Sequence, residues 1–324
     1  MLITEMLALA AGFALLTWSA DRFVVGAAGT ARLLGVPTLL VGIIVAGFGT
    51  SAPEILISGI AAWEGRPGIA VGNALGSNVA NIGLILGTTA IAYPLVVRRG
   101  ILRREMPLMG AVTVLAFVLL ADRQITRFEG LLLLAALAGV LYWLTRQAGQ
   151  GDPLADALEA ELNEDMPKQP SWVGALGWLM GGLALLLASS RLIVWASVTI
   201  ARSLGISDLV IGLSIVALGT SLPELATCIA SARKSESDIA LGNIIGSNIF
   251  NLLAVLGLAG FIAPLTAASA ALTRDFPLMA ALTLAAFALA WRPGGNAGHL
   301  GRLAGIVFLA TYIAYQSILA LSQL

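Results

Sequence analysis

Apolar residues follow one another along this chain in long blocks, and short polar segments separate the blocks. A block of about 18 residues or more can cross a hydrocarbon core about 30 Å thick as a single helix. Ten blocks meet this length, over residues 3–31, 37–62, 68–93, 101–121, 128–146, 172–202, 208–232, 239–262, 272–291 and 302–322. The pattern therefore predicts an all-α integral membrane protein with ten transmembrane helices.

Composition agrees with this fold class and excludes an ordinary soluble domain. Hydrophobic residues make up 58% of the chain and charged residues 11%, and the mean hydropathy is +0.93. Lys plus Arg and Asp plus Glu number 18 each, so no net charge indicates a nucleic-acid partner. The first block starts almost at Met1 and lacks a basic leader, so we interpret it as a retained span. The single Cys228 excludes an internal disulfide and is interpreted as a packing residue, and His299 as a solvated loop residue and not a proton relay.

Basic residues are divided unevenly between the two sides of the predicted membrane. Eleven lie in loops on the side away from the termini, namely Arg32, Arg98, Arg99, Arg103, Arg104, Arg146, Lys168, Arg233, Lys234, Arg292 and Arg302. Five lie on the opposite side, namely Arg66, Arg123, Arg127, Arg202 and Arg274. The positive-inside rule therefore predicts a multi-pass protein of the cell (inner) membrane with both termini outside.

The two halves of the chain repeat each other at a constant offset of 170 residues. The motif "GTSAPE" from Gly49 returns as "GTSLPE" from Gly219, and "GNALGSN" from Gly72 returns as "GNIIGSN" from Gly242. The stretch "RREMPLM", which ends at Met109, likewise matches "TRDFPLM". Because each copy has five spans, an odd number, the second copy enters the membrane from the opposite side. This predicts inverted repeats related by a pseudo-two-fold axis in the membrane plane.

The predicted organisation is a first repeat over residues 1–146, an acidic cytoplasmic linker over 147–171 and a second repeat over 172–324. The linker carries six acids, namely Asp152, Asp156, Glu159, Glu161, Glu164 and Asp165. Their spacing is not that of an EF-hand, so we interpret the linker as a solvated connection with a short surface helix and not as a regulatory cation-binding element.

Each repeat places oxygen-bearing side chains on its second and third helices. Residues four apart share one face of a helix, so Thr50 and Glu54 point the same way, with Ser51 beside them. The second repeat has the same pattern at Thr220, Ser221 and Glu224. The third helices carry stripes at i, i+4 and i+8, namely Asn73, Ser77 and Asn81, and Asn243, Ser247 and Asn251. Small-xxx-small pairs on the same helices, Gly72 with Gly76 and Gly242 with Gly246, favour close approach of neighbouring backbones.

Prolines and carboxylates mark these helices as functional. Pro53 and Pro223 lack an amide hydrogen, so each predicts a kink that frees carbonyls around 47–49 and 217–219. Hydroxyls, amide oxygens, carbonyls and two carboxylates, without imidazole or thiol, suit calcium, sodium or similar hard cations. A carboxylate at the centre of a membrane helix costs roughly 3 kcal/mol, so two at matching positions predict a function. Asp21 and Arg22 are explained by pairing or interfacial snorkelling.

At this point the sequence resembles the calcium/cation antiporter superfamily, and within it the prokaryotic sodium/calcium exchangers. The paired "GTSAPE" and "GTSLPE", each followed by "GNALGSN" or "GNIIGSN", look like the two alpha-repeats of that family, and the resemblance covers essentially the whole chain. It implies that Glu54 and Glu224 are calcium ligands. It also implies sodium coordination by Thr50, Ser51, Ser77, Thr220, Ser221 and Ser247, with carbonyls of Gly47 and Ala217, and a centre completed by Asn81 and Asn251.

Two departures bear on the coupling ions. Several relatives have an aspartate where this chain has Asn251, and the potassium-dependent branch is similar in using an acid there, so potassium cotransport is put in doubt. The proton-coupled branch typically has a glutamate within its "GN" motif, whereas Ala74, Leu75 and Gly76 follow Asn73 here. The resemblance therefore ranks proton coupling below sodium coupling.

The sequence predicts a secondary antiporter that exchanges sodium for calcium by alternating access, with the helices over 3–31 and 172–202 as the moving pair. Its predicted partners are calcium and sodium ions and the lipid bilayer, with no cofactor and no obligate protein partner. A proton/calcium or broader divalent antiporter is the alternative within transporters, and a passive cation channel is the alternative of another class. A membrane enzyme has little support, because no histidine cluster and no nucleophile-base pair is present.

Overall fold

The computed structural model describes residues 2–34, 38–148, 171–233, 235, 237–291 and 297–322. The helices of the first half are α1 (Leu2–Leu33), α2 (Thr38–Trp63), α3 (Pro67–Ala80), η1 (Asn81–Leu86), α4 (Gly87–Ala92), η2 (Ile101–Glu105), α5 (Met106–Leu120) and α6 (Arg127–Ala148). Those of the second half are α8 (Trp172–Leu204), α9 (Asp208–Ile211), η3 (Gly212–Val216), α10 (Ala217–Thr220), α11 (Leu222–Arg233), α12 (Ser237–Phe250), η4 (Asn251–Val255), α13 (Leu256–Ile262), η5 (Ala271–Asp275), α14 (Phe276–Ala290) and α15 (Arg302–Leu321). The η segments are π-helices. Where an η segment directly adjoins α-helices, as in Pro67–Ala92, Ser237–Ile262 and Ala271–Ala290, the segments together form one continuous helical rod.

The described helices follow the predicted spans closely. Each predicted span corresponds to a helix or rod whose ends differ from the prediction by no more than two residues. Six of them are long and apolar enough to cross a membrane by themselves, or seven if the bent pair 208–220 and 222–233 is one span. The rod of η2 and α5 is not among them, because its first turn carries Arg103, Arg104 and Glu105. The chain is therefore a mostly helical membrane protein, and the count of ten crossings stays a prediction.

Local sequence explains where several helices begin and end. The hydroxyl of Ser171 accepts a hydrogen bond from the Gly174 amide and caps α8, and Ser207 caps α9 in the same way through Val210. Pro67 opens α3, where its missing N–H has no intrahelical partner in any case. Gly205 ends α8 with a φ of 66°, a conformation that favours glycine.

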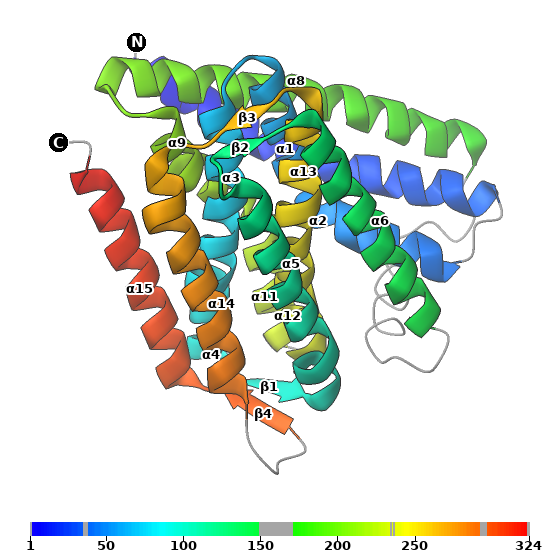
Figure 1. Cartoon of the computed structure of the whole chain (residues 1–324). Coiled ribbons are helices and arrows are strands. Elements are labelled where there is room, and N and C mark those ends of the chain that lie inside the picture. The colour runs from blue at the N-terminus through cyan, green and yellow to red at the C-terminus, as the bar shows by residue number, and fades with distance from the viewer. Residues whose placement is uncertain are drawn as a thin grey trace.

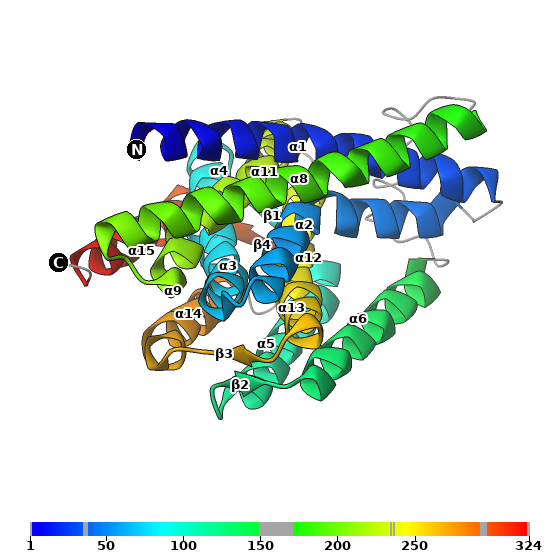
Figure 2. The same cartoon turned by 90° about the horizontal axis from the view of Figure 1, so that it is seen from above.

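Helices α1 and α8 lie side by side at one end of the molecule and extend from left to right in Figure 1, whereas α14 and α15 extend from top to bottom. Seen from above, α1 and α8 form one side of the molecule, and α6 lies on the opposite side (Figure 2). A Cβ added at Gly12 would lie 2.7 Å from Ile193, and one at Gly26 would lie 2.6 Å from Leu179 Cα. Residue numbers rise along α1 as they fall along α8, so the two helices are antiparallel, and glycines bring their backbones together.

Two short strand pairs correct the all-α prediction. Strand β1 (Leu95–Arg98) pairs antiparallel with β4 (Ala297–Leu300), and β2 (Gln124–Ile125) pairs with β3 (Leu265–Thr266). Each pair joins a segment of one half to a segment of the other. His299, predicted in a loop, lies in β4 instead, although its side chain is exposed as expected. Apolar periodicity does not reveal strands of two to four residues, since they pair with segments far away in the chain.

Several predictions concern residues outside this description. Residues 149–170, which include most of the acidic linker, are not described, and neither are Lys234 and Arg292. The helix backbone is described at Asp21, Arg32, Thr50 and Arg202, but their side chains are not, and for Gly47 too only its place in the helix is described.

Candidate cation site

The predicted site residues whose side chains are described are all buried in the middle of the helical core. They are at most 4% exposed, namely Ser51, Glu54, Ser77, Asn81, Ala217, Thr220, Ser221, Glu224, Ser247 and Asn251. Gly47 and Thr50 belong to the same helix as Glu54, in a part of α2 for which the structure describes the backbone alone. Burying so many polar groups is costly unless each finds a partner, so their arrangement calls for a physical explanation.

The backbone beside each carboxylate is held by an asparagine of the next helix. In the first half Asn73 Nδ2 donates to the Glu54 carbonyl at 3.2 Å and to Ser58 Oγ at 2.9 Å. In the second half Asn243 Nδ2 lies 3.5 Å from the Glu224 carbonyl. It also lies 3.4 Å from Cys228 Sγ, so the thiol stands where the first half has the Ser58 hydroxyl. Cys228 thus packs within a helix, as predicted, and also accepts a hydrogen bond. The two carboxylates therefore have matching supports.

The two halves of the site interleave. Thr220 of α10 donates to Asn73 Oδ1 of α3 at 3.3 Å, and Ser77 Oγ donates to the same oxygen at 3.4 Å. Helix α2, which carries Glu54, packs against η4 of the second half, and α11, which carries Glu224, packs against η1 of the first. The helix that carries the glutamate of one half therefore packs on the π-helix that begins with the site asparagine of the other half, Asn251 for α2 and Asn81 for α11. The residues of the two halves thus form one composite site.

Glycines make this close packing possible in α3. A Cβ added at Gly72 would lie 2.5 Å from the Leu209 carbonyl oxygen and 3.0 Å from Gly212 Cα. One at Gly76 would lie 2.7 Å from Leu213 Cα and 2.8 Å from Ala217 Cβ. The predicted small-xxx-small role is confirmed for this pair, because any side chain would push α3 away from α9, η3 and α10.

Several buried oxygens at the site have no hydrogen-bond partner within the described residues. They are Ser51 Oγ, Glu54 Oε2, Asn81 Oδ1, Ser221 Oγ and Asn251 Oδ1. They come from α2, η1, η4 and the residue between α10 and α11, and therefore from both halves of the chain. Among the described residues no three His, Cys, Asp or Glu side chains come together, which fits a centre of neutral oxygens with two carboxylates. Buried oxygen atoms of this kind suit a hard cation as cargo, which would satisfy them by coordination.

Sequence reasoning missed two residues that contact the site asparagines and two more that lie behind them. Asn81 Nδ2 donates to Asn248 Oδ1 at 2.9 Å, and Asn251 Nδ2 donates to Asn78 Oδ1 at 3.2 Å. Behind them, Asn248 Nδ2 lies 3.6 Å from Met109 Sδ and Asn78 Nδ2 lies 3.4 Å from Met279 Sδ. The duplicated "GSN" motif and the two aligned methionines were the signals that could have found them.

The backbone of the second half differs from the prediction. The Ala217 carbonyl is not free, because it accepts from Ser221 N at 3.1 Å and from Thr220 Oγ1 at 3.3 Å. The bond from Ser221 is the ordinary helical bond to the residue four positions earlier, and Pro223 removes only the donor that the Gly219 carbonyl would have had. The chain turns by 42° at Ser221, between α10 and α11. By contrast, α2 runs as one helix through Pro53.

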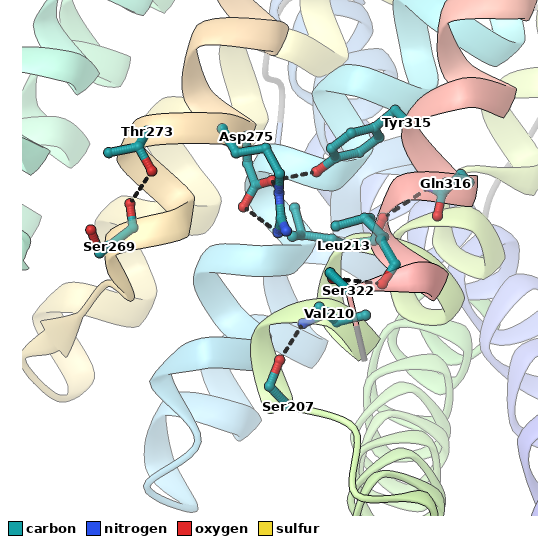
Figure 3. A network of polar contacts seen from close by, with 11 residues as sticks. Ser207, Val210, Leu213, Ser269, Thr273, Asp275, Tyr315, Gln316 and Ser322 are labelled. Carbon is teal, nitrogen blue, oxygen red and sulfur yellow. Dashed lines mark hydrogen bonds and ion pairs between the residues drawn. The ribbon is translucent and has the colours of Figure 1, made fainter. Parts of the chain in front are cut away.

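A second buried polar cluster lies beside the site helices (Figure 3). Asp275 is fully buried, and its Oδ1 accepts from Tyr315 Oη at 2.9 Å and from Arg274 Nε at 2.7 Å. The next residue of α15 is Gln316, whose Nε2 donates to the Leu213 carbonyl of η3 at 3.3 Å. This cluster therefore ties α14 and α15 to each other and α15 to the helix that leads into the site.

Arg22 lies half-buried between α1 and α8. Its Cζ is 5.8 Å from the ring centroid of Trp18 and 5.3 Å from that of Trp178, and the two rings meet edge to face. Cation–π contact therefore accounts for this charge, and the predicted pairing with Asp21 concerns an undescribed side chain.

Comparison with known proteins shows the family of this chain. The family model described as sodium/calcium exchanger protein matches residues 4–146 and 174–321. The chain belongs to the sodium/calcium exchanger family. The resemblance to the calcium/cation antiporter superfamily is thereby confirmed, and with it the class of the protein, a membrane-embedded cation antiporter and not an enzyme in the catalytic sense.

Relatives and solved structures match over nearly the full length. CaxA of Alkalimonas amylolytica is 48% identical over 95% of this chain and 96% of its own. The sodium/calcium exchanger MaX1 of Methanosarcina acetivorans is 30% identical over 98% of this chain and 99% of its own. A structure of the sodium-calcium exchanger NCX_Mj soaked with Na+ and Sr2+ is 32% identical, with a TM-score of 0.64 over 98% of this chain and 99% of the other.

Proposed function

We propose that this exchanger couples the entry of sodium to the extrusion of calcium through the site between the two halves. The observation that carries the proposal is a set of buried oxygens from both halves of the chain, Glu54 Oε2 among them, that have no hydrogen-bond partner within the described residues. Glu54 and Glu224 bind calcium, and Asn81 and Asn251 complete the centre. Sodium is coordinated by hydroxyls and carbonyls of both halves, namely Thr50, Ser51, Ser77, Thr220, Ser221, Ser247, Gly47 and Ala217. For the Ala217 carbonyl to act as a ligand, its bond from the Ser221 amide must lengthen or be shared.

Charge explains why sodium and calcium compete for this site. Two ionised carboxylates carry a charge of about minus two, which one calcium ion neutralises. If three sodium ions replace it, the loaded centre carries a net charge of plus one, so the exchange is electrogenic. Each net charge that crosses the whole membrane potential contributes roughly 2.3 kcal/mol per 100 mV. An empty centre would have to switch with uncompensated carboxylates, and this cost suppresses leak.

The topology in this proposal is ten spans in two inverted repeats, residues 1–146 and 172–324, with both termini outside and the linker over 147–171 in the cytoplasm. Support comes from pairs of equivalent contacts, in which each half supplies the residue that the other half supplied in the first contact. Gly12 meets Ile193 and Gly182 meets Phe23, and both partners are shifted by 170 positions. The two strand pairs exchange segments between the halves in the same way. The inner membrane protein YrbG of Escherichia coli, 40% identical, supports the proposed location.

Alternating access in this proposal comes from α1 and α8, which slide as a pair along the other helices. Support comes from their antiparallel packing on each other and from the contact of α1 with α10. A Cβ added at Gly219 would overlap the ring of Phe13, so α1 lies directly on the segment that follows Ala217. A disulfide that fixes α1 to α10 should therefore block exchange, and undiminished exchange in that cross-linked protein would exclude sliding.

The deciding experiment is radioactive calcium uptake into sodium-loaded vesicles that hold the purified protein, diluted into sodium-free medium. We expect uptake that requires internal sodium, is abolished by Glu54→Gln and by Glu224→Gln, and responds to an imposed membrane potential. Potassium should have no effect, since position 251 is a neutral asparagine.

Other results would lead to other functions. Uptake without sodium that follows a pH gradient would mean proton coupling, and flux that needs no counter-ion would mean a channel. Full activity of either glutamine variant would contradict the assigned calcium ligands.

A further inference from the structure

Two chains of amide and thioether groups cross the molecule behind the site asparagines. One runs from Asn81 of η1 through Asn248 of α12 to Met109 of α5. The other runs from Asn251 of η4 through Asn78 of α3 to Met279 of α14. All six side chains are at most 2% exposed, so water has little access to replace any member.

The sulfur at the end of each series of hydrogen-bonded groups determines which group donates and which accepts along that series. A thioether has lone pairs but no hydrogen, so it can only accept, whereas an amide side chain donates at one end and accepts at the other. Met109 Sδ therefore holds the NH2 group of Asn248, and the Asn248 oxygen must face Asn81. Asn81 can meet that oxygen only with its own NH2 group, and its Oδ1 then points the other way. The same reasoning applies from Met279 to Asn251.

The remaining oxygens agree with this direction. Asn81 Oδ1 and Asn251 Oδ1 are both buried and have no hydrogen-bond partner among the described residues. If Asn81 were flipped, its NH2 group would face the cation and its oxygen would face the oxygen of Asn248. Both changes are unfavourable, because a cation is not bound by a hydrogen-bond donor and two facing acceptors repel.

We propose that Met109 and Met279, acting through Asn248 and Asn78, are positioning residues that turn the oxygens of Asn81 and Asn251 toward the transported cation. The proposal rests on the proposed function, since it gives those two oxygens a calcium ion to bind. Each relay starts and ends in one half and passes through the other, so the orientation of each asparagine depends on correct docking of the two halves.

The test replaces each sulfur by a group of similar volume that cannot accept a hydrogen bond. Met109→Leu and Met279→Leu do this singly and together. Met106→Leu is the matched control, because Met106 is also buried in α5, one turn earlier, and no hydrogen bond to its sulfur is seen within the described residues. Exchanges of this kind conserve volume and cost little stability, so all three single variants should have similar melting temperatures without ligand.

Three quantities are measured for each variant. They are the rise in melting temperature that calcium causes in detergent, the half-saturating calcium concentration for uptake into vesicles, and the maximal rate of that uptake. We expect Met109→Leu and Met279→Leu to raise half-saturating calcium about five- to tenfold, where tenfold corresponds to about 1.4 kcal/mol, with the maximal rate within about twofold of wild type. The double variant should be weaker than either, and Met106→Leu should match wild type.

The outcomes separate this inference from the proposed function. If calcium stabilises the wild type but Met109→Leu and Met279→Leu behave like Met106→Leu, the relay is wrong and the proposed function stands. If they lose maximal rate and ligand-free stability while half-saturating calcium is unchanged, the methionines are only structural. If calcium does not stabilise the wild type, the proposed function fails and the relay with it. If one of the two variants does not accumulate in the cell, the other variant still tests the proposal, because it interrupts the equivalent relay that ends at the other methionine.

Discussion

Replacing Gly76 by alanine tests whether close packing of α3 on the second half builds the site. An added Cβ would lie 2.7 Å from Leu213 Cα and 2.8 Å from both the Leu213 oxygen and Ala217 Cβ. Ordinary contact begins at about 3.4 Å, so α3 must move away by about 0.7 Å at this point, the difference between 3.4 and 2.7 Å. Two of the three atoms belong to backbone, so they cannot rotate aside.

The cost of this movement has two parts. Overpacking costs about 1–3 kcal/mol, and the helix propensity of alanine over glycine returns up to about 1 kcal/mol, so the protein should still fold. The site suffers more, because metal–ligand distances tolerate only about 0.2 Å. The same displacement would stretch the 3.3 Å contact between Thr220 and Asn73, which joins the two halves.

We therefore expect Gly76→Ala to raise half-saturating calcium at least about tenfold, equivalent to about 1.4 kcal/mol, and to lower the melting temperature by only a few degrees. Calcium uptake into sodium-loaded vesicles and thermal unfolding in detergent provide the two measurements. Gly139→Ala is the control, since Gly139 is exposed on α6 with no described atom within 4 Å of an added Cβ. Wild-type calcium affinity in Gly76→Ala would refute the reasoning.

Two further substitutions test the polar contacts around the site. Tyr315→Phe removes the hydroxyl that donates to buried Asp275, so the free energy of unfolding should fall by about 1–3 kcal/mol, whereas the exposed Tyr142→Phe should change the melting temperature little. Cys228→Ser should keep calcium affinity within about twofold, because a serine hydroxyl can accept from Asn243 as the thiol does and the first half has serine at this position. A tenfold loss of calcium affinity in Cys228→Ser would contradict the equivalence of the two supports.

Much of this protein could be predicted from its sequence because the membrane restricts the choices. A chain in hydrocarbon must satisfy its backbone within helices, so apolar blocks predict helix ends to within two residues. For the same reason Glu54 and Glu224 stand out, since a carboxylate in such a block is costly and rarely accidental. The 170-residue offset then relates each residue of one half-site to its counterpart.

Other features depend on contacts between segments far apart in the chain. The strand pairs, the π-helices and the bend at Ser221 leave no periodic signal. Asn78 and Asn248 resemble any other polar residue of their motif until the other half is docked against them.

The sequence by itself determined the spans, the duplication, the family and most of the candidate ligands, since hydrophobicity, spacing and buried charge are properties of residue type and order. Only the tertiary structure decided which oxygens lack partners within the described residues and which amides face each other. Each hydrogen bond between Asn81 and Asn248, or between Asn251 and Asn78, joins two halves, and no local pattern encodes the relative position of these halves.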